Sequence, residues 1–364
     1  MILEENKYVP VLRWRQGEYQ ALLRLNSATK DRIMPLICVP RVEFDFETLQ
    51  LKKTVHDHVH PFVKRYCEKW DTRPAWIALD KSIAADKMND GSHVFDYIFD
   101  GIRPHDTRAI PALSLLDDSA TLAAATRVVA EDHRGIALLV RLEDLMTSTL
   151  HTKIKEFANA VPVPFKDIDL ILDLQAPNFE PYTAFTKALI AALQRLNNLD
   201  TFRNLVIVSS AIPKSFKDIA KGTDEIPRHD WLFYQTLLSE LPSGMRQPVY
   251  GDYTVVHPEF TVPLDMRIIK PVGKIIYTAE EIWATRKGGA FRANPLQMHD
   301  HCKIIITDER FQFRGPDFSF GDEYIADCAV YKEEPSTLAW WKGITINHHI
   351  TTVVDALAKL VAAP

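Results

Sequence analysis

Eight short apolar segments, each separated from the next by enough sequence for a helix, constrain the fold of this chain more than any other feature. Several are continuous runs of Val, Ile and Leu rather than alternating patterns, as expected for strands buried on both faces of a parallel sheet. Right-handed βαβ connections would close such strands into a barrel. The segments are residues 8–12, 33–39, 75–79, 109–115, 136–140, 168–172, 205–208 and 248–250.

This rhythm predicts an α/β fold, a (β/α)8 TIM-like barrel, over residues 1–255. An open doubly wound sheet is the alternative, although no Gly-rich turn follows the first segment, which weakens its dinucleotide-binding form. After residue 255 the pattern predicts a C-terminal α+β extension. We expect residues 256–345 to be an inserted segment that caps the barrel mouth, and residues 346–364 to be a C-terminal helix that packs back on the barrel.

Local patterns indicate the elements of the extension. Residues 267–276 resemble one or two strands, and residues 279–286 a short helix that Gly288 and Gly289 would end. The segment 284–292, which carries Arg286, fits either a phosphate-binding loop or a solvated turn. An apolar stripe over residues 347–360 predicts an amphipathic helix, which could be the eighth barrel helix delayed by the insertion.

Composition narrows the class of partner. The 364 residues are 46% hydrophobic, enough for a large core, and the net charge is −5. That charge disfavours nucleic acid and anionic lipid as bulk electrostatic partners, but it leaves a local basic cleft open. The four cysteines form no CxxC pair, which favours reduced thiols in a cytoplasmic protein. No apolar run reaches the length of about 18 residues that a membrane span needs, so we expect no membrane association.

Polar residues at the ends of the apolar segments form the candidate site, because barrel function resides at the carboxyl ends of the strands. They are a mixture of acids and bases, and arginines offer paired donors to phosphate or carboxylate. The simpler interpretation is that these residues have no functional role, and that charged residues occur at the strand ends because the apolar core stops there. The residues predicted to bind a ligand in this way are Arg13, Arg41, Lys81, Arg141 and Ser209, together with Arg286 of the extension.

Three aspartates at the same strand ends are candidates for acid–base chemistry. Asp80, Asp173 and Asp252 could act as general acid or base or hold a divalent cation. His257 follows the eighth segment and could transfer protons beside Asp252. No motif with metal-ligand spacing is present, so we predict no metal site. The cofactor is left open, with a divalent metal not favoured.

Several sequence strings together resemble the bacterial and prophage "beta protein" family, which is named after a gene of a satellite phage. The resemblance spans residues 8–352 and brings Trp14 and Tyr253 to the proposed mouth beside His257. The strings are YVPVLRWRQGEYQALLRL, IMPLICVP, YGDYTVVHPEF, FSFGDEYI and WWKGITINHHIT.

The resemblance implies a cytoplasmic component of a bacterial anti-phage defence system, but it supplies no catalytic residues. We therefore hypothesise that the mouth binds a phage-derived, nucleotide or other polyanionic ligand. The first alternative is a barrel hydrolase that uses aspartate acid–base chemistry on a phosphate or sugar substrate. The second is a non-catalytic scaffold for a partner encoded nearby. The partner would be a phage protein or a protein of the same defence locus.

Overall fold

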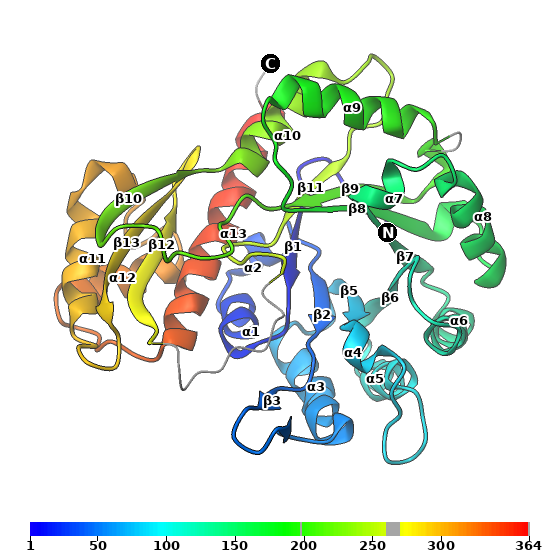
Figure 1. Cartoon of the computed structure of the whole chain (residues 1–364), viewed down its shortest axis with the longest axis horizontal. Coiled ribbons are helices and arrows are strands. Elements are labelled where there is room, and N and C mark those ends of the chain that lie inside the picture. The colour runs from blue at the N-terminus through cyan, green and yellow to red at the C-terminus, as the bar shows by residue number, and fades with distance from the viewer. Residues whose placement is uncertain (197–198, 260–269, 363–364) are drawn as a thin grey trace.

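The computed structural model describes residues 1–196, 199–259 and 270–362. Within these ranges, eight parallel strands form a closed barrel, which confirms the predicted α/β fold (Figure 1). Around the barrel the strands follow chain order. The labels β3, β4 and β10 are missing from the series because those strands lie outside the barrel. The barrel strands are β1 (Tyr8–Leu12), β2 (Leu36–Val39), β5 (Pro74–Leu79), β6 (Arg108–Ser114), β7 (Ile136–Arg141), β8 (Ile168–Gln175), β9 (Asn204–Ser209) and β11 (Val249–Asp252).

Alternate residues of each strand fill the barrel interior, because successive side chains of a strand point to opposite faces. Val9 and Val11 of β1, Trp76 of β5 and Ile171 of β8 belong to this inner core. The residues between them face the surrounding helices and join a larger core. Both faces of every strand are therefore covered by apolar groups, which explains the continuous apolar runs.

A helix follows each barrel strand and packs outside it, so that the helices ring the barrel (Figure 1). Asp118 accepts hydrogen bonds from the first turn of α6, and Thr54 does the same for α3, which fixes where these helices begin. The first seven helices are α1 (Gln16–Leu23), α3 (Val55–Lys69), α5 (Val94–Ile102), α6 (Ser119–Asp132), α8 (Leu150–Ala160), α9 (Tyr182–Gln194) and α10 (His229–Glu240).

The eighth position is taken by α13 (Leu338–Ala362), which packs against α1 and β1. The helix predicted over residues 347–360 is thus confirmed, and it begins nine residues earlier than the apolar stripe indicated. The stripe residues Ile350, Val353 and Leu357 are buried in the large core. This helix follows all eight barrel strands in the chain, yet it packs over β1, the first of them.

A small antiparallel sheet lies beside the barrel, on the far side of α13 (Figure 1). It has the order β10 (Gly222–Pro227), β13 (Ile282–Ala290) and β12 (Val272–Thr278). One of its two edge strands, β10, comes from the connection between β9 and α10, which lies within the range predicted to be barrel. The helix α11 (Gln297–Thr307) packs on the sheet, and α12 (Phe320–Ala329) packs against α11 and α13. We call this sheet with α11 and α12 the small lobe.

The short helix predicted over residues 279–286 is wrong, because most of that segment lies in strand β13. Trp283 and Thr285 favour a strand, and the segment pairs with β10 on one side and β12 on the other. The part of the chain from 260 to 269, which includes the start of the strand predicted at 267, lies outside the described residues. None of the described helices combines the length and the hydropathy that crossing a bilayer would need.

Candidate functional site at the barrel mouth

A cavity of about 620 Å3 opens at the carboxyl ends of the barrel strands. Small and apolar side chains, among them Ala78, Ala112 and Leu139, form its floor. Its volume falls within the range of about 300–1,000 Å3 that is typical of small-molecule sites. The charged and titratable residues around it are Arg13, Arg15, Arg41, Asp80, Lys81, Asp117, Arg141, Glu143, Asp173, Tyr253, His257 and Glu259.

Strand geometry explains why these particular side chains meet. Arg13 continues the inward-facing series Val9 and Val11, and Asp173 continues the series of Ile171. Arg141 stands next to Asp173 in the paired register of β7 and β8. In each strand the inward-facing positions are apolar until the carboxyl end, where the next inward position carries a charged residue. The charged side chains therefore lie together on the rim at the carboxyl end of the barrel.

The carboxylates of the rim already accept hydrogen bonds from their own surroundings. One oxygen of Asp173 accepts a hydrogen bond from the Tyr253 hydroxyl at 2.8 Å, and the other accepts one from the Gln175 side-chain amide. Asp80 caps the short helix α4 (Lys81–Ala84) by accepting from the backbone N–H of Ser82 at 3.0 Å. These acids are therefore held in place by neutral donors.

The arginines of the rim are less well satisfied. Arg41 Nε lies 3.8 Å from Asp80 Oδ2, and Arg141 Nη1 lies 3.6 Å from Asp173 Oδ2. Both distances exceed those of a charge-assisted hydrogen bond, about 2.7–2.9 Å. Arg13 is only 9% exposed, and its buried Nη1 has no hydrogen-bond partner within the part of the chain that the structure describes. The mouth therefore offers spare guanidinium donors.

The pKa shifts of the titratable groups at the cavity do not produce an activated nucleophile among the described residues. Burial raises the pKa of the Cys38 thiol to about 12, so the thiol stays protonated at neutral pH. Burial also raises the pKa of Asp117 and lowers the pKa of His257. Across the described ranges, no group of three or more His, Cys, Asp or Glu side chains is arranged to hold a metal ion.

Eight of the twelve residues that the sequence assigned to the site line this cavity. They are Arg13, Arg41, Asp80, Lys81, Arg141, Asp173, Tyr253 and His257.

The other four lie elsewhere, for identifiable reasons. Ser209 and Asp252 are strand-end residues of the outward-facing parity, because Val208 and Tyr253 occupy the inward positions. Trp14 is buried among the rings of Tyr19, Phe62 and Tyr66 behind the barrel wall. Arg286 lies in β13 of the small lobe rather than in a loop at the mouth.

Sequence reasoning missed several polar residues of the cavity wall, among them Gln175, Asp117 and Glu143. Gln175 donates to both Asp173 and Tyr253 from the end of β8, where a β-bulge shifts the register. Because the apolar run ends at residue 172, no local pattern indicates that the strand continues to Gln175. Asp117, which accepts from the backbone N–H of Ser114 at 2.7 Å, and Glu143 follow strand ends and could have been found by extending the strand-end rule into the loops.

Comparison of the sequence with protein-family models identifies a family. The family model described as "Beta protein" matches residues 8–355, which is nearly the whole chain. The chain belongs to the Beta protein family. No curated protein matches the sequence. The family name specifies no activity, so the function must be argued from the geometry.

Asp252 belongs to a buried polar network outside the barrel wall. Its carboxylate accepts hydrogen bonds from the hydroxyls of Tyr8 and Tyr250 and lies 3.0 Å from His349 Nε2 of α13. Burial alone would raise the pKa of Asp252, but His349 and the hydrogen bonds outweigh that effect and hold the pKa below its usual value.

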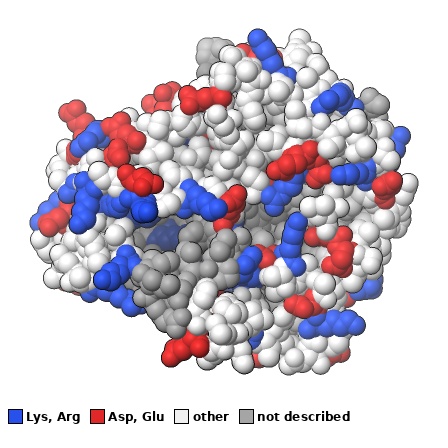
Figure 2. Space-filling view, viewed as in Figure 1, with Lys and Arg blue, Asp and Glu red and all other residues white. Residues whose placement is uncertain are grey.

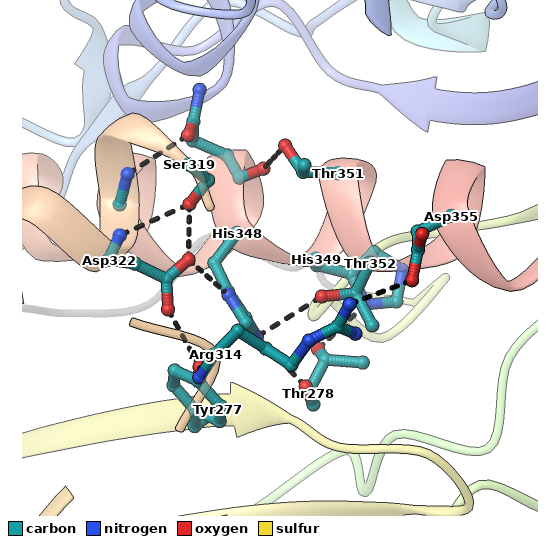
Figure 3. Close-up of polar contacts among 12 residues, drawn as sticks. Tyr277, Thr278, Arg314, Ser319, Asp322, His348, His349, Thr351, Thr352 and Asp355 are labelled. Carbon is teal, nitrogen blue, oxygen red and sulfur yellow. Dashed lines mark hydrogen bonds and ion pairs between the residues drawn. The ribbon is translucent and has the colours of Figure 1, made fainter. Parts of the chain in front are cut away.

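The neighbouring His348 contacts α12 and β12 of the small lobe (Figure 3). Its Nδ1 lies 2.8 Å from Asp322 Oδ2 of α12, and its Nε2 lies 2.8 Å from the carbonyl oxygen of Thr278. His349 also reaches the small lobe, because its Nδ1 lies 2.9 Å from the hydroxyl oxygen of Thr278. The two histidines thus connect the barrel and the small lobe through α13.

Proposed function

We propose that the barrel mouth binds a small anionic ligand that carries a phosphate or carboxylate group, and that Arg13, Arg41 and Arg141 recognise that group. We further propose that this binding serves a bacterial anti-phage defence system, the role that the family resemblance implies. A ligand formed or released during phage infection would be the signal that the mouth detects. The support for the first proposal lies in the hydrogen bonding of the rim.

Among the described residues, none is a hydrogen-bond partner for the buried Nη1 of Arg13, and this observation carries the proposal. A buried donor without a partner costs about 1–3 kcal/mol, and more when the group is charged. Arg13 lies at the inward end of β1, at the wall of a cavity large enough for a small molecule. An anion that accepts hydrogen bonds from Arg13 would remove this cost, and planar guanidinium groups fit phosphate and carboxylate oxygens in pairs.

The state of the carboxylates favours recognition over acid–base catalysis. The hydrolase alternative used Asp80, Asp173 and Asp252, but Asp252 lies outside the cavity. Asp173 accepts from Tyr253 and Gln175, and Asp80 accepts from the backbone of its own helix. These contacts orient the two acids so that they hold Arg41 and Arg141 in place near the ligand.

Replacement of Arg13 tests the proposal. Titration calorimetry with inorganic phosphate, pyrophosphate and nucleoside phosphates should show wild-type binding of at least one of these anions. Arg13→Gln should weaken that binding at least tenfold, about 1.4 kcal/mol. The free energy of unfolding should stay the same or increase, because the variant loses an unpaired buried charge. In cells where the wild-type chain protects against phage, Arg13→Gln should lose protection.

Arg195→Gln provides the matched control, because Arg195 is exposed at the end of α9 on the outside of the barrel. It should bind and protect as the wild type does. If no anion of the panel binds, or if Arg13→Gln binds the anion as tightly as the wild type, the mouth is not an anion site.

A further inference from the structure

Charge is distributed unevenly along the small sheet. Strand pairing brings Gly222 and Val272 to the same end as Ala290, and it leaves the turn between β12 and β13 at the other end. The turn end carries Glu225, Glu280 and Glu281. The opposite end, which we call the basic end, carries Lys221, Lys270, Lys274, Arg286, Lys287 and Arg292. Two clusters of opposite sign thus lie at the two ends of one sheet.

The basic end continues toward the barrel mouth. Lys287 Nζ donates to the carbonyl oxygens of Phe216 and Ile219, which holds the connection between β9 and β10 over this end of the sheet. Lys217 is exposed on that connection, and Lys214 reaches Glu259 at the edge of the cavity. Figure 2 shows lysine and arginine side chains gathered over this lobe and toward the centre of the molecule.

Lys342 of α13 adds a cation between the barrel mouth and the basic end. Lys342 forms an ion pair of 3.1 Å with the buried Glu18, close to Arg15 of the cavity wall. The positive charge of Lys342 also acts on Lys274 of the small sheet. Cations therefore extend from the mouth across the start of α13 to the basic end.

The basic end brings like charges close together. Lys274 lies directly opposite Lys287 across the β12–β13 pair, and like charges in that position are destabilising. Within the described ranges, no salt bridge involves Lys274, Arg286 or Lys287. Burial, with Lys287 and Lys342 nearby, lowers the pKa of Lys274 to about 7. A chain with a net charge of −5 nevertheless concentrates cations here.

We propose that the basic end of the small sheet and the connection before β10 form a binding surface for nucleic acid, which they hold through its phosphates. A row of cations that leads away from a cavity fits a linear polyanion with evenly spaced charges better than a compact ligand. Lysine and arginine contacts to phosphate carry no sequence information, so the surface would bind strands of any sequence. This inference does not require the mouth to bind a small anion.

Charge reversal at three exposed positions tests the surface. The full chain should bind fluorescent single-stranded RNA or DNA at low salt, measured by anisotropy, with an affinity that falls as salt increases. The triple variant Lys217→Glu, Lys221→Glu, Arg292→Glu should weaken binding at least tenfold. Each lost phosphate contact flattens the plot of log K against log salt by about 0.7 for a single strand, so the slope should decrease by about 2.

A second triple variant separates a local site from overall charge. Lys155→Glu, Lys166→Glu, Lys187→Glu changes the net charge equally at exposed positions on the far side of the barrel. It should keep nearly all of the affinity. Equal losses in both variants, wild-type binding to no oligonucleotide, or binding only to vesicles that contain phosphatidylserine would each overturn the inference. Arg13→Gln should retain oligonucleotide binding, which distinguishes this surface from the mouth.

Discussion

At the scale of single residues, the buried polar groups of the chain serve two separate purposes. Arg13 is buried without a hydrogen-bond partner in the described structure and lies at a cavity, an arrangement that costs stability and suits a ligand. Asp252 and His349 are fully buried and paired with each other. Neither residue lines the mouth cavity, and the pair connects β11 to α13. Burial and charge alone therefore do not distinguish a binding residue from a structural one, but the hydrogen bonding does.

Removal of the Asp252 carboxylate should be strongly destabilising. Asp252→Ala leaves His349 and the hydroxyls of Tyr8 and Tyr250 without their shared acceptor in a buried place. We expect the free energy of unfolding, measured with urea, to decrease by about 3–5 kcal/mol. Asp300→Ala, which removes an exposed carboxylate 3.8 Å from Lys303, should change it by less than about 1 kcal/mol. Similar effects of the two substitutions would contradict the structural role.

Lys274 gives a prediction for pH. Burial and the charges of Lys287 and Lys342 lower the pKa of Lys274 from its ordinary value of 10.5 to about 7 in the folded protein. Between these two values the unfolded chain binds a proton that the folded chain lacks, so stability increases with pH across the window. Lys274→Met removes this contribution. The wild type should therefore gain stability relative to Lys274→Met from the lower to the upper end of the window, and a constant difference would contradict the shifted pKa.

At the scale of elements, α13 belongs to both parts of the molecule. Its apolar stripe was recognisable in the sequence because a surface helix keeps a regular spacing of buried residues. The strand β13 was not recognisable, because its strand character depends on pairing with β10 and β12, which are distant or follow different patterns. Helix signals are local, whereas sheet signals of this kind depend on partners that the local sequence does not contain.

The contact between α13 and α1 depends on two glycines that lie against each other. A Cβ added at Gly17 would lie 2.6 Å from the Ala339 carbonyl oxygen and 3.1 Å from the Gly343 nitrogen. Gly17→Ala should therefore force the helices apart and lower the free energy of unfolding by about 1–3 kcal/mol, although alanine favours a helix. At Gly289 an added Cβ would meet no atom within 4 Å, so Gly289→Ala should be nearly neutral. A stabilised Gly17→Ala in thermal unfolding would contradict the close packing.

At the scale of the whole molecule, the barrel could be predicted and the assembly of the small lobe could not. Periodic burial marked all eight strands, and the strand-end rule found Arg13, Arg141 and Asp173 at one rim. The rule failed at Asp252 because the last apolar residue of a strand does not reveal which face the next residue takes. The small sheet combines a strand from between β9 and α10 with two strands from after β11, and no local pattern indicates that they pair.

The shared helix predicts how the molecule unfolds. Because α13 covers the barrel and packs on the small lobe, neither part is complete without it. We expect the barrel and the lobe to unfold in one calorimetric transition rather than two. Asp252→Ala should move that transition as a unit to lower temperature, in both intrinsic fluorescence and far-UV circular dichroism. Two resolved transitions, of which Asp252→Ala moves only one, would show that the parts are independent.

The late position of α13 also affects how the protein is made on the ribosome. The amino-terminal strands emerge first during translation, and the outer surface of β1 stays uncovered until more than three hundred further residues have been added. A nascent chain that stalls anywhere before α13 would expose that apolar surface and would be a substrate for chaperones and proteases. Only completed synthesis would then cover the outer surface of β1, so a cell would accumulate few partly folded chains.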